Sequence, residues 1–341
     1  MSPRRIAALL SILFVASSRH ATAQSGLLLG VNTTSGYRTL WIAPVAGKPR
    51  VVGSGADLIV PGKTGFWRVC VSSRHVLETD MLVSTDTIVA EPATGRRGVC
   101  ATTDSVTDAE QNARRCESNT RLVIQFVSGD LLSVEESGDS DCGAHPSSGV
   151  RHVLTTLRND TTSLEKLLTS EQRADLRRQS LVAAKKEFEG FGQFNVRDDD
   201  ARNVNRLADL HDWAVERGVA RWQANGTISC TPYVGCGAMS QRFSIPAFRL
   251  PKTVVGHDAL TPPFSAIRKR YPGARDAVSS PTGDIAVVVT DDEILVFAPT
   301  RGELGEPVDR LKVSGTVVMA QWAIGRYVST WTEQLRSLLL Q

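Results

Sequence analysis

The sequence predicts an α+β protein made mainly of antiparallel β-strands, with a helix-containing module in the middle of the chain. Short β-rich runs separated by turn residues fill both ends of the sequence. A helical period of 3.6 residues replaces the strand period of 2 mainly between residues 163 and 218. We therefore expect a signal peptide (residues 1–23), an N-terminal β-meander region (24–105), a central α+β module (106–250) and a C-terminal β-meander region (251–341).

The first 23 residues have the composition of a secretory signal peptide. Arg4 and Arg5 precede the apolar run 6–16, and Ala-Thr-Ala at 21–23 forms a small-x-small cleavage site. The apolar run is shorter than the roughly 20 residues that a membrane-spanning helix needs, and no later run is long enough. We expect a soluble mature chain that is secreted or periplasmic and has no membrane span.

Net charge argues against a nucleic-acid partner. The chain has 39 basic and 36 acidic residues, and three of the arginines lie in the signal peptide, so the mature chain is close to neutral. Its longest basic run is the short segment 268–270. Nucleic-acid binding requires a basic face that neutralises phosphates, so we expect no such partner. A hydrophobic content of 41% is sufficient for a large core.

The chain has six cysteines, all after the signal peptide. An even number of cysteines in an exported chain is typical of disulfides, although six cysteines allow fifteen pairings. We favour sequential pairing, which closes the shortest loops: Cys70–Cys100, Cys116–Cys142 and Cys230–Cys236.

The two terminal regions share a pattern of strands and tight turns. The turns "TTSG", "VAGK" and "GKTG" separate apolar runs in the N-terminal region, and similar runs return after residue 280 and continue through "RYVSTW" at 326–331. Residues 40–49 also align with residues 295–304 as a weak internal repeat. Such a repeat is typical of β-propellers and β-sandwiches, so a propeller-like arrangement is one expectation. We expect the two terminal regions to pack together.

The central module begins with a hairpin and continues with helices. Residues 121–137 form two apolar runs around Ser-Gly-Asp at 128–130, which indicates a β-hairpin. Ser163 is a candidate cap for "LEKLL", and Thr169 with Gln172 matches a capping box for a helix that ends near Gly190.

The apolar positions of that helix, and the segments after it, complete the expected elements. We expect Ala174, Leu181, Ala184 and Phe188 to form the buried stripe of the helix. Further short helices are expected at 198–207, 211–218 and 264–270, with a strand between the last two that ends at Cys230.

Two short motifs imitate enzyme signatures. Ser163-x-x-Lys166 matches a pattern of penicillin-recognising enzymes, but the Lys-Thr-Gly triad at 63–65 precedes the serine instead of following it. We interpret Ser163 as a helix cap and residues 61–65 as a hairpin turn. His-Glu-x-x-His, Cys-x-x-Cys and Gly-x-Ser-x-Gly are absent from the sequence. We expect no metal and no cofactor.

The segment "SDCGAHPSSGV" at 140–150 contains the strongest candidate for a catalytic group. His145 is a possible general base, because imidazole titrates near neutral pH and the carboxylate of Asp139 or Asp141 would orient it. The structural alternative is a turn imposed by the neighbouring glycine and proline, with Cys142 in a disulfide. We favour the structural turn.

Three aromatic residues also have a functional and a structural interpretation. Trp41, Phe66 and Trp67 lie in predicted strands and are candidates for a contact surface. Aromatic residues of strands are more often part of the core, and we favour that interpretation.

Residues 121–246 resemble the extracytoplasmic domain of lysozyme-sensing anti-sigma factors and of proteins associated with peptidoglycan deacetylases. The resemblance depends on Gly-Ala-His-Pro at 143–146, on Leu164, Leu167 and Leu168, and on "TPYVGCGAMSQRFSIP" at 231–246. It implies an α+β module that serves envelope proteins by binding or by supporting another domain. It does not imply catalysis.

These observations together predict a non-catalytic binding or accessory module of the cell envelope, whose partner is an envelope protein or a glycan. The alternative is a hydrolase that uses His145 with Asp139 or Asp141. The sequence does not decide whether the protein is an enzyme, although it favours a binding protein.

Overall fold

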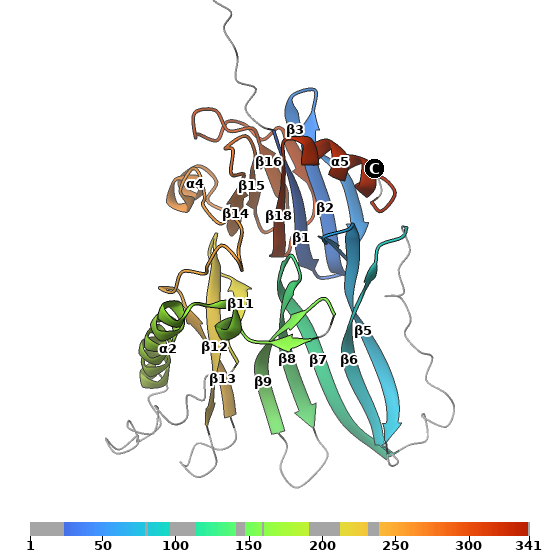
Figure 1. The fold of residues 1–341 in the computed structure, drawn as a ribbon, viewed down its shortest axis with the longest axis vertical. Helices are drawn as coiled ribbons and strands as arrows, with labels where there is room; N and C mark the ends of the chain where they lie inside the picture. The colour runs from blue at the N-terminus through green and yellow to red at the C-terminus, as the bar shows by residue number, and fades with distance from the viewer. Residues whose placement is uncertain are drawn as a thin grey trace, which may run out of the picture.

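The computed structural model describes residues 24–78, 81–95, 114–140, 147–158, 160–190, 212–230 and 239–339. Most of these residues lie in antiparallel strands, and helices α2 (Ser170–Gly190), α4 (Phe264–Arg270) and α5 (Arg326–Leu335) pack around them (Figure 1). The predicted α+β class is therefore confirmed. The propeller-like arrangement is wrong, because the described strands form three sheets, none of which is closed or arranged as propeller blades.

The largest sheet joins strands from both ends of the chain with strands from its middle. Its main path contains β10 (Thr161–Thr162), β9 (Ser147–Thr156), β8 (Leu131–Ser140), β7 (Arg114–Ser128), β18 (Thr316–Ile324), β1 (Ser25–Thr33), β2 (Gly36–Val45) and β3 (Lys48–Ala56), in that order. β1 and β18 pair antiparallel, with Ser25 opposite Ile324 and Asn32 opposite Thr316. The predicted domain boundaries stay predictions.

The same sheet branches at β7. The end of β7 pairs parallel with β18 through Val127 and Met319, whereas its first half pairs parallel with β6 (Met81–Pro92). β6 continues the branch to β5 (Phe66–Glu78) and β4 (Leu58–Pro61), both by antiparallel pairing. One strand of 15 residues therefore connects both branches.

β1 is buried on both faces. Leu27, Leu29 and Val31 belong to one apolar cluster, whereas Leu28 belongs to a second cluster on the opposite face. Side chains alternate between the faces of a strand, so the continuous apolar run of this segment reflects cover on both sides. The Trp41 indole lies against Gly26, where a β-carbon would collide with the ring.

The predicted turns of the β regions are present. Residues 61–65 form the β4–β5 connection, in which the Gly62 amide donates to the Gly65 carbonyl at 2.7 Å. Gly129 adopts the left-handed conformation between β7 and β8, with φ of 56°. Both hairpins follow from local turn chemistry, since glycine has no β-carbon to oppose positive φ.

A three-stranded sheet contains β11 (Ala214–Arg217), β12 (Trp222–Cys230) and β13 (Met239–Ile245). The expected helix at 211–218 is wrong, because the described part of that segment contains β11, which pairs with β12 through a tight turn closed by Gly218 and Arg221. Ala214 to Glu216 are buried on both faces of the strand. Tertiary packing therefore decided that this segment is a strand and not a helix.

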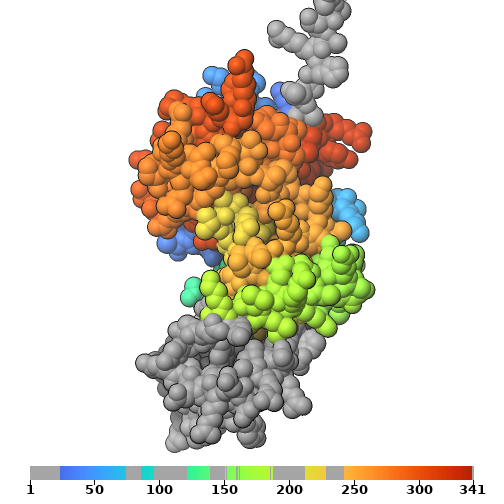
Figure 2. All heavy atoms as spheres, turned by 90° about the vertical axis from the view of Figure 1, so that its left-hand side faces the viewer, coloured from blue at the N-terminus to red at the C-terminus, as the bar shows by residue number. Residues whose placement is uncertain are grey.

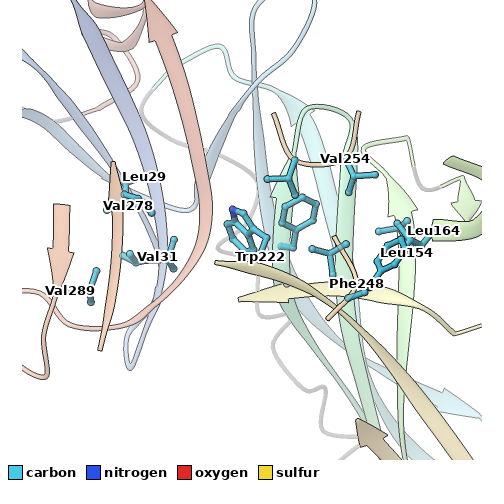
Figure 3. Packing of buried hydrophobic residues seen from close by; sticks show 14 of the residues in the cluster. Leu29, Val31, Leu154, Leu164, Trp222, Phe248, Val254, Val278 and Val289 are labelled. Atoms are coloured by element: carbon cyan, nitrogen blue, oxygen red, sulfur yellow. The ribbon is translucent and has the colours of Figure 1, made fainter. Parts of the chain in front are cut away.

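A four-stranded meander lies against β1. It contains β14 (Asp276–Ser279), β15 (Ala286–Val289), β16 (Ile294–Phe297) and β17 (Asp309–Leu311). Figure 3 shows Leu29 and Val31 of β1 close to Val278 and Val289 of this meander, and all four belong to one apolar cluster. The meander therefore covers one face of the strand.

The start of α2 confirms the predicted capping box. The Gln172 amide donates to Thr169 Oγ1 at 3.2 Å, and the Thr169 amide donates to Gln172 Oε1 at 3.0 Å. Ser163 precedes the 3-10 helix η2 (Leu164–Leu167), but its side chain makes no capping hydrogen bond, so the predicted capping role is wrong.

The buried face of α2 differs from the predicted stripe. Leu176, Ser180 and Ala184 are buried, whereas Ala174 is exposed. A spacing of four residues on an α-helix follows one face, and the strands beneath selected this face. The side chain of Phe188 and the expected helix at 198–207 lie outside the described residues.

Of the remaining helices, one was predicted and one was not. α4 occupies the expected residues, Phe264–Arg270. The expected strand through "RYVSTW" is wrong, because Gly325 has a φ of 61° after β18 and α5 begins at Arg326. Val328 and Leu335 of α5 are buried in the second apolar cluster. None of the described helices has the length and apolar character needed to cross a membrane.

Arg217 connects the three-stranded sheet to the four-stranded meander. Its Nε and Nη2 donate to the two carboxylate oxygens of Asp276 at 2.8 and 2.9 Å, and its Nη1 donates to Asp258 at 3.2 Å. The guanidinium also lies 4.8 Å from the ring centre of Trp222. Only 3% of the Arg217 side chain is exposed. Burial raises the pKa of Asp258 to about 6, although the positive charge of Arg217 opposes this shift.

Replacing Arg217 by methionine should destabilise the fold strongly. The largely buried carboxylate of Asp276 and the partly buried carboxylate of Asp258 would lose their cation, which costs about 3–5 kcal/mol. Urea unfolding followed by intrinsic tryptophan fluorescence would measure it. Arg221→Met is the matched control, because Arg221 is exposed and lies on the same hairpin; equal stability of the two variants would contradict the role of Arg217.

Candidate functional site

The predicted catalytic residues are not placed by the structure. His145, Asp141 and Cys142 lie outside the described residues, and only the backbone of Asp139 is described, at the end of β8. The catalytic and the structural interpretations of His145 therefore both stay predictions. Cys70 is buried and is not a free thiol. The sequential disulfide pairing also stays a prediction.

The aromatic candidates form part of the core. Trp41 and Phe66 are buried, and Trp67 is partly buried in the second apolar cluster. The Trp41 indole donates to Thr332 Oγ1 of α5 at 3.0 Å, and both Trp41 and Phe66 contact the ring of Trp331. The favoured core interpretation is therefore confirmed for Trp41 and Phe66.

A groove of about 620 Å³ lies between α2 and β13. Its strand side is formed by the consecutive residues 242–245 of β13 and by the two residues that follow. Because strand side chains alternate between faces, a groove bordered by four consecutive strand residues runs along the edge of the strand. Figure 2 shows α2 in green at the surface of this side of the molecule. The groove is lined by Arg178, Gln179, Val182, Ala183, Lys186, Arg242, Phe243, Ser244, Ile245, Pro246 and Ala247.

The groove combines positive charge with apolar surface. Arg178 and Lys186 of α2 are exposed, and Arg242 of β13 is about one-third exposed. None of the residues that line the groove is acidic. Val182 is 68% exposed, the highest value among the large hydrophobic residues of the described chain. This composition suits an elongated ligand that carries both negative charge and apolar groups.

Arg242 connects the groove to a buried polar network, here called the Arg242 cluster. Its Nη1 donates to Glu135 Oε2 of β8 at 2.9 Å, and its Nη2 contacts the Glu216 carboxylate of β11. Glu216 is 1% exposed and accepts further hydrogen bonds from Gln223 and from Ser244. The cluster consists of Gln125, Glu135, His152, Glu216, Gln223, Asn225, Arg242 and Ser244.

The two carboxylates hold the guanidinium in one orientation. An arginine between two anions loses most of its rotational freedom, and the pairing compensates for the burial of Glu216. The position of Arg242 beside the groove is therefore fixed before any ligand arrives, and Glu135 and Glu216 already balance its charge.

His152 is the buried imidazole of this cluster. It is 1% exposed, its Nδ1 lies 3.3 Å from Asn225 Nδ2, and its Nε2 lies 3.9 Å from Glu135 Oε2. Burial lowers the pKa of His152 to about 4, and the positive charge of Arg242 lowers it further in the same direction. The imidazole is therefore neutral at pH 7 and, being enclosed, supports the cluster instead of meeting a ligand.

The described residues contain no group of three or more histidine, cysteine or acidic side chains that could hold a metal ion. Sequence reasoning missed both the groove and the Arg242 cluster. The available signal was the segment "QRFSIP", in which Arg242 and Ser244 alternate with the buried Phe243 and Ile245. Alternation predicts a strand, but it does not reveal partners such as Glu135, which lies 107 residues away along the chain.

Acidification should destabilise the protein through His152. The unfolded histidine has a pKa near 6.5 and the folded one near 4, so the unfolded state binds more protons between these values. The free energy of unfolding should therefore fall by about 3 kcal/mol as the pH drops from 6.5 to 4.

The raised pKa of Asp258 acts in the opposite direction over part of this range, because its contribution to stability is lost as the pH rises toward 6. The test is therefore the difference in unfolding free energy between the wild type and His152→Gln, measured in urea from pH 7 to pH 4. A difference that does not change with pH would show that His152 titrates normally.

Comparison with known proteins gives a distant structural likeness. No family model and no curated protein matches the sequence. Among solved structures, a DUF3298 family protein from Pseudomonas aeruginosa PAO1 matches at 16% identity and a TM-score of 0.30, covering 53% of this chain and 90% of that protein. At this TM-score the match carries no argument about fold or function. What the comparison gives is a match to a DUF3298 protein over about half of the chain. The resemblance to lysozyme-sensing anti-sigma factors stays a prediction.

Proposed function

We propose that this protein is an exported, non-catalytic binding or accessory module of the cell envelope, and that it holds an envelope protein or a glycan in the groove between α2 and β13. The observation that carries the proposal is the groove itself. Its volume of about 620 Å³ lies within the roughly 300–1,000 Å³ of typical ligand sites. Three cationic side chains and an exposed valine line it.

Hydrogen bonds and ion pairs order the side chains and the helix on both sides of the groove, which favours binding. On the strand side, Glu135 and Glu216 orient Arg242. On the helix side, α2 has a complete capping box, and Arg177 donates two hydrogen bonds to Glu165 of η2 at 2.8 and 3.0 Å. A site whose side chains are already ordered loses less conformational entropy when a ligand binds.

Export is supported by the sequence. The basic start, short apolar run and small-x-small site of residues 1–23 match a signal peptide, and an even number of cysteines suits an oxidising compartment. The positive charge that is accessible in the groove comes from the exposed side chains of Lys186 and Arg178 on a nearly neutral chain, so it favours a local anionic partner over general attraction to polyanions.

Charge reversal in the groove should abolish partner binding. Arg178→Glu with Lys186→Glu changes two exposed side chains, so folding should be retained, whereas electrostatic complementarity to an anionic ligand should be lost. The measurement is retention of the oxidised mature protein by isolated peptidoglycan in sedimentation and by envelope proteins on a matrix, with thermal melting of each variant.

The matched control is Arg268→Glu with Lys269→Glu on α4, which makes the same change of residue type and net charge at exposed positions away from the groove. We expect the control to bind like the wild type. Equal binding by both double variants, or no saturable binding by the folded wild type, would refute the proposed function.

A further inference from the structure

We infer that the ligand of this groove is an extended peptide segment with alternating acidic and apolar side chains, which binds by adding a strand to the free edge of β13. The inference rests on the proposed function and makes it more specific. Four observations on the described residues support it: the position of β13 in its sheet, the direction of the groove, the charges that line it and the apolar surface of α2.

β13 is an edge strand. In the described sheet it pairs only with β12, along seven residue pairs from Cys230–Met239 to Ala224–Ile245. In an antiparallel strand, alternate residues direct their N–H and C=O groups to the same neighbour, so every second residue of an edge strand directs them outward. Such a row of donors and acceptors is a template for another strand.

The groove follows this edge. Its strand side consists of four consecutive β13 residues, 242–245, and continues through Pro246 and Ala247. The four β13 residues are long enough to pair with about four residues of an extended chain, at about 3.3 Å per residue, and the chain turns after Ile245. Phe243 and Ile245 are buried in an apolar cluster that also contains Leu176 and Ala184 of α2.

The side chains around the groove match a peptide with two kinds of residue. The side chains of an extended peptide alternate in direction, so one set would meet Val182 and Ala183 on α2. The other set would approach Lys186 and Arg178 of α2, where carboxylates form charge-assisted hydrogen bonds. Arg178 also pairs with Asp175 at the helix surface, and Arg242 is already paired with Glu135 and Glu216. An uncharged glycan would leave Lys186 without an acidic group and would have no regular partner for the backbone groups of β13.

The probe is an eight-residue peptide of alternating glutamate and valine, acetylated, amidated and labelled with a fluorophore. We expect fluorescence anisotropy to show saturable binding to the oxidised mature protein. Affinity should fall at least about tenfold in the Arg178→Glu, Lys186→Glu variant and should stay unchanged in the Arg268→Glu, Lys269→Glu control. A lysine–valine peptide of the same length should not bind.

Two further measurements test strand addition itself. The same peptide with N-methylated valine backbone nitrogens cannot donate along one edge, and we expect its affinity to fall at least about tenfold. Hydrogen exchange with mass spectrometry should show slower exchange in residues 239–245 when the unmodified peptide is bound. Equal binding of the methylated peptide, with no protection of these residues, would overturn the inference.

Other outcomes separate this inference from the proposed function. If peptidoglycan or an envelope protein binds in a groove-dependent manner and no acidic peptide does, the proposed function stands and the peptide inference is wrong. If no ligand depends on the groove, both are wrong.

Discussion

The antiparallel pairing of β1 with β18 is the interaction on which the rest of the structure depends. It joins the beginning of the described chain to its end, across nearly 300 residues, and places β18 between β1 and β7 in the largest sheet. Apolar clusters lie on both faces of β1. One face carries the four-stranded meander, and the other carries β4, β5 and α5. Loss of this pairing would expose both clusters and separate the N-terminal strands from the middle of the chain.

The buried polar contacts of Arg217 and of the Arg242 cluster set the positions of the two smaller sheets. Arg217 connects the three-stranded sheet to the meander, and the Arg242 cluster connects it to β8 and β9 of the large sheet. Buried ion pairs add little net stability compared with apolar packing, but their directional bonds select one arrangement. The groove along β13 depends on this arrangement, because the small sheet must lie at a defined distance from α2.

Local interactions could be predicted from the sequence. The β4–β5 turn, the turn at Gly129, the Thr169–Gln172 capping box and the extent of α2 depend on residues that are close in the chain, and all four were predicted correctly. Two segments were predicted wrongly. Residues 211–218 were expected to be a helix, but pairing with β12 makes the described part a strand, and residues 326–331 were expected to be a strand, but the left-handed Gly325 ends β18 and a helix follows. The buried stripe of α2 was also predicted only in part, because strands distant in sequence selected the buried face.

The sequence by itself determined the α+β class, the alternation of strands and turns, and the principal helix, because hydrophobic period and turn chemistry act over a few residues. Tertiary structure alone decided which strands pair, where the sheets meet, and that Arg242 lies between Glu135 and Glu216 beside a groove. These contacts join residues tens to hundreds of positions apart. Many pairings satisfy the same pattern of apolar and polar residues, and only the packing of the complete chain selects among them.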